Sequence, residues 1–218
     1  PLLDSLPRRM PYTACLGLSD NGQPLLIRLT ALEVTHLLVA GATGSGKTEL
    51  MRTILASLAV SNRQRELQMV LIDPKSRGFG PLAGLPHLLM PPVTQVPHAV
   101  EVLQRLVLEM ERRDQHGVST PHLVIAIDEV VDLMMQGGAL VTNALTRLAQ
   151  RGREAGLHLV VGAQKPTTQL FGGQLKANFP VRLIGKVTSA QDSLAAAGIG
   201  GVGAEQLLGR GDFMVVAA

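Results

Sequence analysis

The residues with the clearest chemical potential lie at positions 41–48, GATGSGKT, which match the phosphate-binding pattern G-x-x-x-x-G-K-[ST] at every defined position. Glycines at three of these positions let the backbone curl so that its N–H groups face a phosphate. At this spacing Lys47 reaches the β- and γ-phosphates of a nucleotide, and the Thr48 hydroxyl ligates Mg²⁺. The segment therefore predicts ATP and Mg²⁺ as bound groups. The residues expected to line the nucleotide are Gly41, Ala42, Thr43, Gly44, Ser45, Gly46, Lys47, Thr48 and Glu49.

A second chemical signal is the acidic pair Asp128 and Glu129, which follows the apolar run LVIAI at positions 123–127. Asp128 at the end of a buried strand would hold Mg²⁺, directly or through water, and Glu129 would orient or deprotonate the attacking water. An Asp–Glu pair taken alone is more often an exposed strand end. Because phosphoryl transfer needs both a phosphate cradle and such an acid pair, the two signals together predict a nucleotide-hydrolysing site.

Two further polar residues follow apolar runs. Gln164 comes directly after the run at 158–163 and is a candidate sensor of the γ-phosphate or the attacking water, with an ordinary loop residue as the alternative. Asp73 ends the run at 69–73, where it either supports the site from behind or starts a turn. The six histidines are scattered along the chain and indicate no metal site.

The elements that must position these residues alternate between strands and helices. Continuous apolar runs separated by helical patterns predict an α/β fold with a mostly parallel sheet covered by helices on both faces. The segment up to Pro24 is irregular chain or edge strands, and residues 74–97 are mostly loop. The expected strands are 36–40, 69–73, 123–128, 158–163, 181–186 and 213–217. The expected helices are 48–60, 100–113, 139–154 and a short one between Ser189 and Gly198.

Length and composition fit a single globular domain over residues 1–218, with an irregular lead-in over about the first 15. Five aromatic residues argue against a single-strand binder built on stacking platforms, and a net charge of +3 does not by itself indicate nucleic acid. Cys15 is the only cysteine, so neither an internal disulfide nor a cysteine zinc site is expected. Without an apolar run of about 18 residues we expect no membrane segment in this chain and a cytoplasmic location.

Eight stretches along nearly the whole chain together carry a family resemblance. They are HLLVAGATGSGKTELM, VLIDPK, LPHLL, LEMERR, LVIAIDEVVDLMM, RLAQRGREAGLHLVVGAQKP, KANFPVR and GAEQLLGRGDFM. In order and spacing, from about Leu16 to about Val215, they resemble the motor domain of the FtsK/SpoIIIE/HerA family of DNA-pumping ATPases. The resemblance implies a RecA-like P-loop NTPase fold, a homo-hexameric ring and ATP-driven movement of double-stranded DNA through its pore.

The resemblance also assigns roles outside the nucleotide cradle. Arg153 lies where the family has an arginine that reaches the ATP site of the neighbouring subunit, with Arg151 and Arg182 as reserves. Lys165 and Lys176 match basic positions that face DNA in the pore. The alternative for each of these residues is a solvated surface charge.

One stretch departs from the family pattern. The second pore segment of the family resembles SSKIDSR, whereas positions 188–194 here read TSAQDSL. Ala190 and Leu194 therefore replace two basic residues. Because phosphate contacts dominate sequence-independent DNA affinity, this departure predicts weaker DNA binding with a flatter salt dependence.

Two other functions stay open. A protein-exporting ATPase of the type VII secretion kind shares this core, and a nucleotide-binding scaffold domain without turnover is a third possibility. Stimulation of the ATPase by DNA would indicate the DNA motor, and stimulation by a secreted peptide would indicate the protein exporter. The intact Lys47, Asp128 and Glu129 argue against the scaffold domain. A guanine-specific GTPase is disfavoured, since the sequence has no Asn-Lys-x-Asp or Thr-Lys-x-Asp element. Chromosome segregation, conjugation and packaging are not distinguished.

Overall fold

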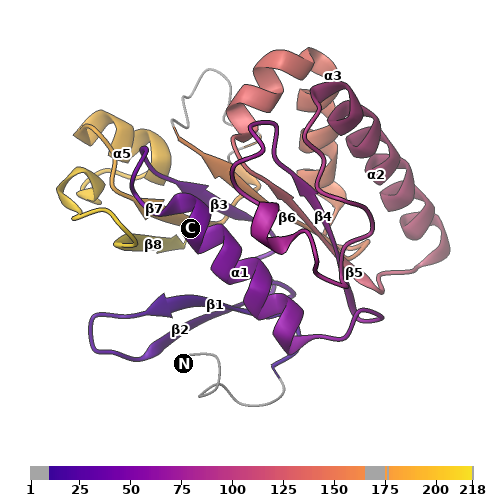
Figure 1. Ribbon diagram of the computed structural model, residues 1–218, viewed down its shortest axis with the longest axis horizontal. Coiled ribbons are helices and arrows are strands. Elements are labelled where there is room, and N and C mark those ends of the chain that lie inside the picture. The colour runs from indigo at the N-terminus through magenta and orange to yellow at the C-terminus, as the bar shows by residue number, and fades with distance from the viewer. Residues whose placement is uncertain (1–9, 165–174, 176, 218) are drawn as a thin grey trace.

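The strands form two sheets in the computed structural model, which describes residues 10–164, 175 and 177–217. An antiparallel hairpin comprises β1 (Thr13–Leu18) and β2 (Pro24–Arg28). The second sheet has six strands in the order β4-β5-β6-β3-β7-β8, as Figure 1 shows. Its strands are β3 (Leu37–Ala40), β4 (Leu67–Ile72), β5 (His122–Ile127), β6 (Leu157–Ala163), β7 (Val181–Gly185) and β8 (Phe213–Ala217).

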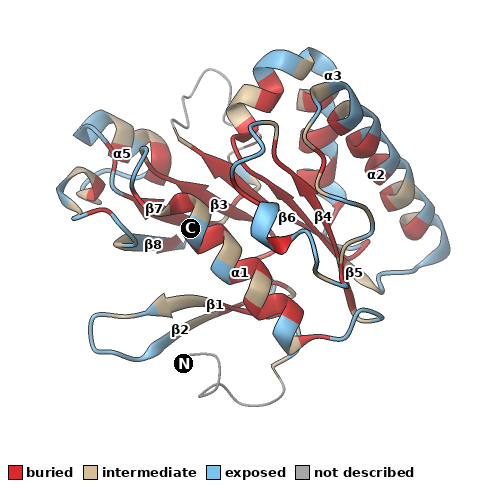
Figure 2. Cartoon of the chain, viewed as in Figure 1, coloured by how far each residue is buried: buried red, intermediate tan, exposed pale blue. Residues whose placement is uncertain are grey.

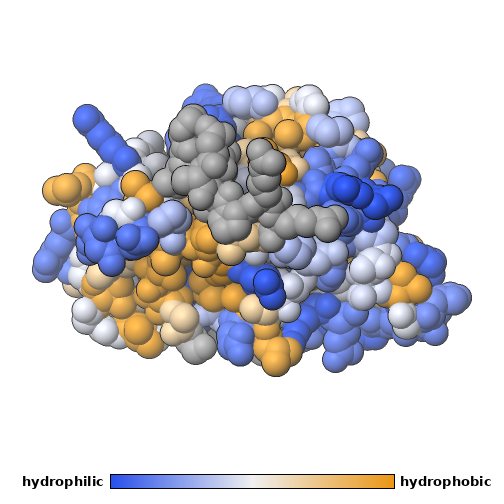
Figure 3. Space-filling model, turned by 90° about the horizontal axis from the view of Figure 1, so that it is seen from below, coloured by the Kyte–Doolittle hydropathy of each residue, from blue (hydrophilic) through white to orange (hydrophobic). Residues whose placement is uncertain are grey.

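The large sheet is parallel except at one edge. The pairs β4–β5, β5–β6, β6–β3 and β3–β7 are parallel, and β8 joins β7 in the antiparallel sense. Every residue of β3, β6 and β7 is buried, which explains why these segments read as continuous apolar runs. The edge strand β8 instead leaves Met214 and Val215 partly exposed. Figure 3 shows apolar surface gathering on the side of the molecule where β1, β2 and β8 lie.

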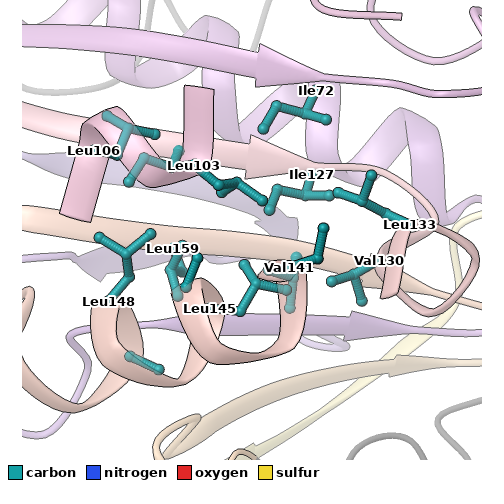
Figure 4. Close-up of a cluster of buried hydrophobic side chains, with 14 of the residues drawn as sticks. Ile72, Leu103, Leu106, Ile127, Val130, Leu133, Val141, Leu145, Leu148 and Leu159 are labelled. Carbon is teal, nitrogen blue, oxygen red and sulfur yellow. The ribbon is translucent and has the colours of Figure 1, made fainter. Parts of the chain in front are cut away.

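Helices cover both faces of this sheet, as the sequence predicted. On one face α1 (Lys47–Ser61) packs with the hairpin, and on the other lie α2 (Val96–His116) and α3 (Val130–Arg151). Alternate residues of each strand serve the two layers: Ile125 and Ile127 face α2 and α3, whereas Val124 and Ala126 face α1. Figure 4 shows the aliphatic packing between the sheet, α2 and α3, and Figure 2 shows the buried strands between the helices.

Two helices differ in length from the sequence prediction. The helix expected at 139–154 begins at Val130, because two helical stretches join across a kink at Gly138, whose φ of 59° and ψ of −143° are non-helical. Glycines 137 and 138 weaken the local helical signal, which hid the first turns from the sequence pattern. The helix expected at 100–113 is α2, longer at both ends, and Gly117 ends it in the left-handed conformation as expected.

The remaining elements are the hairpin, one short helix and two 3₁₀ turns. The hairpin is tied to α1 by hydrogen bonds from the Cys15 N–H to the Ser57 hydroxyl and from the Tyr12 N–H to the Asn62 amide oxygen, both 2.9 Å. The short helix α5 (Ala190–Ala197) is capped by Ser189 and ended by Gly198, which confirms the prediction. Short 3₁₀ turns occupy Gly80–Leu82 and Ala204–Gln206.

Buried histidines lie at the amino-terminal ends of the parallel strands. The Leu159 N–H donates to His36 Nδ1 (2.9 Å), so the neutral ring donates from Nε2 to the Ala149 carbonyl (3.1 Å). His158 donates from Nδ1 to the Thr35 carbonyl (3.1 Å), which leaves its Nε2 to accept from His122 (2.9 Å). Burial lowers the pKa of His36 to about 3 and that of His158 to about 4.

Candidate active site

The phosphate loop joins β3 to α1 at the carboxyl-terminal ends of the parallel strands. Gly44 and Gly46 have φ of 82° and 95°, a conformation that glycine adopts without strain. A Cβ atom at Gly46 would lie 2.7 Å from the backbone nitrogen of Gly211. The loop therefore needs glycine here both for its curl and for its close packing against a distant segment.

That distant segment precedes β8 and holds the loop from outside. The Arg210 N–H donates to the Gly44 carbonyl (3.0 Å), and the Gly211 N–H donates to the Ser45 carbonyl (2.8 Å). Because these carbonyls accept hydrogen bonds from outside the loop, the N–H groups of the loop can point inward and bind an anion. The sequence pattern alone did not link this GRGDF stretch to nucleotide binding. The glycines flanking Arg210 were the available signal, since glycine marks close backbone approach.

A cavity of about 250 Å³ lies over the loop and the start of α1. It brings together the predicted phosphate-binding residues and two of the residues expected from other strands. Gly41, also predicted to line the nucleotide, is not among the lining residues; a Cβ atom there would meet the Ser45 hydroxyl at 2.5 Å. The cavity is lined by Ala42, Thr43, Gly44, Ser45, Gly46, Lys47, Thr48, Glu49, Glu129 and Gln164.

The acid pair and the loop lysine meet in this site. Lys47 forms ion pairs with Asp128 and with Glu129, the second at 3.0 Å between Nζ and Oε1. The Thr48 hydroxyl donates to Asp128 Oδ2 at 3.0 Å. Lys47, Asp128 and Glu129 are all at least nine-tenths buried, so each charge depends on the others for compensation.

The Thr48 hydroxyl and the Asp128 carboxylate have the chemistry of a magnesium site. Mg²⁺ prefers oxygen ligands and takes only one or two protein groups when substrate phosphates and water complete its shell. The two side chains already lie within hydrogen-bond distance of each other, one from the loop and one from the end of β5. The donor set therefore fits the cation that the sequence predicted.

Glu129 is held in an unusual backbone conformation. Its φ of 55° and ψ of 49° are left-handed, which is uncommon for a residue with a side chain and is typical of sites where geometry matters. Gln164 donates from Nε2 to Glu129 Oε1 at 2.7 Å. The structure thus brings the end of β6 to the carboxylate expected to activate water, and the sensor role of Gln164 stays a prediction.

The loop after β4 completes the site. The buried Asp73 carboxylate accepts hydrogen bonds from the N–H groups of Gly78 (2.6 Å) and Phe79 (3.2 Å), so this residue organises the turn from within. Lys75 in the same loop lies 2.7 Å from Asp132 and 3.9 Å from Glu129, measured from Nζ to carboxylate oxygens. The hydrogen bond to Asp132 raises the pKa of Lys75. Lys75 is a residue of this site that the sequence pattern did not predict.

Arg153 lies far from this cluster in its own chain. It follows α3 and precedes the amino-terminal end of β6, whereas Lys47 and Glu129 lie at the carboxyl-terminal ends of the strands. A cavity of about 650 Å³ at that end is lined by Arg153, Arg151, Asp114 and other polar residues. None of the predicted phosphate-binding residues lines this cavity. Arg153 is therefore available only to a ligand or molecule at the opposite end of the sheet.

The two reserves for this role, and the nearby Arg147, are engaged within the chain. Arg151 pairs with Asp114 at 2.7 Å, and Arg147 pairs with Glu111. Arg182 is buried in β7 and donates to the carbonyls of Phe179 and Ala197, so it is a structural residue. Of the reserves, Arg151 alone keeps a position at the surface.

The two lysines expected to contact DNA, Lys165 and Lys176, lie outside the described residues. Ala190 and Leu194 lie on α5, and half of the Leu194 side chain is exposed. Basic side chains at these two positions would therefore reach solvent. Within residues 10–164, 175 and 177–217, no helix is long and apolar enough to cross a membrane.

The family profile and the similar proteins of known name agree on one family. The sequence profile of the FtsK/SpoIIIE family matches residues 7–118 and 115–168. The chain is 36% identical to a DNA translocase FtsK of Staphylococcus epidermidis over 241 residues, covering 99% of this chain and 30% of that protein. It is 38% identical to the DNA translocase SftA of Bacillus subtilis over 227 residues, covering 94% and 23%. The chain thus spans about a third or less of these relatives.

Solved structures show the same fold at lower identity. The cytoplasmic domain of the Thermomonospora curvata type VII secretion ATPase EccC superposes with a TM-score of 0.82 at 23% identity, over 98% of this chain and 28% of that one. The conjugation coupling protein TcpA of pCW3, solved with ATPγS, superposes with a TM-score of 0.79 at 22% identity, over 99% and 68%. These likenesses confirm the P-loop α/β fold class.

Proposed function

Because the chain belongs to the FtsK/SpoIIIE family, we propose that it is the ATP-hydrolysing core of a ring motor that moves double-stranded DNA. The observation that carries the proposal is the meeting of Lys47, Asp128 and Glu129 beside a glycine-rich phosphate loop. These groups arise from separate segments of the chain, and phosphoryl transfer needs all of them.

The ion pairs of the site suggest the order of events when ATP binds. Without phosphate, Lys47 is neutralised by Asp128 and Glu129. A triphosphate offers Lys47 a stronger anionic partner, so the lysine moves to the β- and γ-phosphates. Both carboxylates are then released for their own roles. Mg²⁺ held by Thr48 and Asp128 would neutralise charge on the phosphate oxygens.

Glu129 then acts on the attacking water. Its carboxylate accepts a proton from that water or orients it toward the γ-phosphate, while Gln164 holds the carboxylate through its amide. Glu129 directly follows Asp128 at the end of β5, so both carboxylates lie beside the phosphate loop. Glu129→Gln should therefore keep nucleotide binding and lose hydrolysis.

The position of Arg153 supports assembly into a ring, which we propose to be a homo-hexamer. Its side chain lies at the end of the sheet opposite to the phosphate loop. Copies arranged head to tail would bring this end of one chain to the ATP site of the next. Head-to-tail contacts close into a ring when the rotation between copies allows it.

DNA is the proposed substrate, because the relatives with 36–38% identity are DNA translocases. Lys165 and Lys176 remain the proposed contacts to the duplex. Protein export is the second candidate; the superposition on EccC, at 23% identity, carries the fold alone and does not favour it. We place the domain in the cytoplasm, where ATP is available to it.

The test is ATPase turnover with and without duplex DNA over a salt series, using Lys47→Ala as the inactive control. Duplex DNA should stimulate turnover, and the stimulation should fall steeply as salt rises, because counterion release drives binding. Single-stranded DNA and a secretion-signal peptide serve as competing substrates. Stimulation by the peptide but not by the duplex would overturn the proposed substrate.

A further inference from the structure

Lys75 connects three segments of the active site. It lies in the loop after β4, and its Nζ contacts Asp132 in the first turn of α3 at 2.7 Å. The same atom lies 3.9 Å from Glu129 Oε2. Neither a phosphate-binding nor a water-activating role has been assigned above to this residue, yet it faces the carboxylate on which hydrolysis depends.

The loop that carries Lys75 is fixed at both of its ends. Asp73 binds the N–H groups of Gly78 and Phe79, and Arg52 on α1 donates to the carbonyls of Arg77 and Gly78. A Cβ atom at Gly78 would lie 2.8 Å from Asp128 Oδ2, so the loop packs directly against the acid pair. This packing sets where Lys75 can reach.

The two oxygens of Glu129 have different surroundings. Oε1 is shared by Lys47 (3.0 Å) and Gln164 (2.7 Å), whereas Oε2 faces Lys75. When ATP draws Lys47 to its phosphates, Lys75 is the remaining lysine in contact with Glu129 among the described residues. The backbone of Glu129 is left-handed, a conformation that a residue with a side chain keeps only when its surroundings fix it, and Lys75 belongs to those surroundings.

We propose that Lys75 is a positioning residue for hydrolysis, which holds the Glu129 carboxylate toward the attacking water while Asp132 holds Lys75 in turn. The inference rests on the proposed role of Glu129 in activating water. It predicts a defect in the chemical step and none in nucleotide binding, since Lys75 does not line the phosphate cavity.

The experiment measures single-turnover ATP hydrolysis and the affinity of a fluorescent ADP analogue. Lys75→Met should slow hydrolysis by about 10- to 100-fold, the loss expected when a catalytic group is slightly misplaced. The affinity for ADP should stay unchanged, and Lys75→Arg should recover most of the rate because it keeps the charge. Arg147→Met removes a comparable ion pair, between α3 and Glu111 on α2, and should leave both quantities at the wild-type level.

A double substitution separates positioning from direct contact with ATP. If Lys75 acts through Glu129, Lys75→Met should cause no further loss in a Glu129→Gln background. A further loss there, or weaker ADP binding by Lys75→Met alone, would instead place Lys75 on the phosphates and overturn the inference. If Lys75→Met turns over at the wild-type rate and Glu129→Gln is inactive, the inference about Lys75 is overturned and the proposed function of the site stands. Wild-type turnover of Glu129→Gln overturns the proposed function of the site.

Discussion

The two ends of the same parallel sheet bury polar groups in opposite ways. At the carboxyl-terminal ends, Lys47, Asp128 and Glu129 are buried with charges that compensate one another. At the amino-terminal ends, His36 and His158 are buried in the neutral state, and each ring nitrogen has a hydrogen-bond partner. Burial alone therefore does not mark a functional site. A functional site is marked instead by buried charged groups that can exchange their ion-pair partners for a ligand.

The largest expected effect concerns Arg153, which belongs to the histidine end of the sheet but is proposed to serve the charged end of another chain. Arg153→Ala should lower turnover by about 10³–10⁵-fold, the range known for arginines that stabilise transferred phosphate. Mixing Arg153→Ala chains with Lys47→Ala chains should restore part of the activity. In some interfaces of such mixed rings, an intact cradle meets an intact arginine.

The control for this mixture is Arg151→Ala, since Arg151 pairs with Asp114 within its own chain. It should keep most of the turnover of the wild-type chain. Normal turnover by Arg153→Ala in assembled rings would show that Arg153 is a surface charge. The arginine that connects the two ends of the sheet would then have to be sought at one of the reserves, Arg151 or Arg182.

The next effect is a pH dependence of stability, which the neutral buried histidines should cause. His36 and His158 have pKa values lowered from 6.5 to about 3 and about 4, so between these values and 6.5 the unfolded chain binds more protons. The free energy of unfolding should therefore fall as pH drops from about 6.5 toward 4. Each histidine contributes up to about 1.4 kcal/mol per pH unit, and neither contributes above pH 7.

Urea unfolding of the nucleotide-free chain at pH 5 and pH 7.5 measures this difference. Imidazole NMR signals should show both rings neutral at pH 5, which keeps the test valid if histidine variants fold poorly. The exposed His98 provides the control, because His98→Gln should leave the pH dependence unchanged. Titration of His36 or His158 near pH 6.5 would contradict the assignment.

A smaller effect tests the packing behind the phosphate loop. Gly46→Ala adds a Cβ atom 2.7 Å from the Gly211 nitrogen and also strains a left-handed residue. Gly22→Ala strains a residue of similar φ, 77°, in the β1–β2 turn, where nothing lies within 4 Å. Both should lose about 1–2 kcal/mol of stability from backbone strain, and only Gly46→Ala should also lose ATP affinity. Equal ATP binding by the two variants would show that the contact does not shape the cradle.

The smallest effect concerns α5, which packs beside β7 near the antiparallel edge of the sheet. Ala190→Lys and Leu194→Arg should each raise duplex affinity and steepen its salt dependence by about one unit per new phosphate contact. Val60→Lys adds a charge at an exposed position on α1 and is the control for a general change in charge. An equal gain from Val60→Lys would show that α5 does not face DNA.

The sequence located the charged end of the sheet well, because each of its key residues directly follows an apolar run. The loop at 41–48, Asp128, Glu129 and Gln164 all follow this rule, and the structure brings them together. Lys75 escaped prediction, since it lies in a loop whose path depends on the Asp73 hydrogen bonds. A loop without periodicity gives no indication of which strand end it approaches.

Other features were hidden for different physical reasons. The antiparallel direction of β8 cannot be read from a short apolar run, because the run looks the same in either direction. The start of α3 was masked by its glycine pair, although Val130 and Leu133 are fully buried. The contact between Gly46 and Gly211 joins residues far apart in the sequence: the glycines flanking Arg210 indicate a close backbone approach, but no local pattern indicates its partner.

This contact has a consequence for the order in which the protein matures on the ribosome. The phosphate loop emerges early, but the Arg210 and Gly211 N–H groups that hold its carbonyls emerge after every other strand of the six-stranded sheet except β8. A nascent chain that stops before this segment has the GATGSGKT sequence without the two hydrogen bonds that hold its carbonyls. Since a ligand stabilises only the state that binds it, cellular ATP would favour completed chains over such truncated ones.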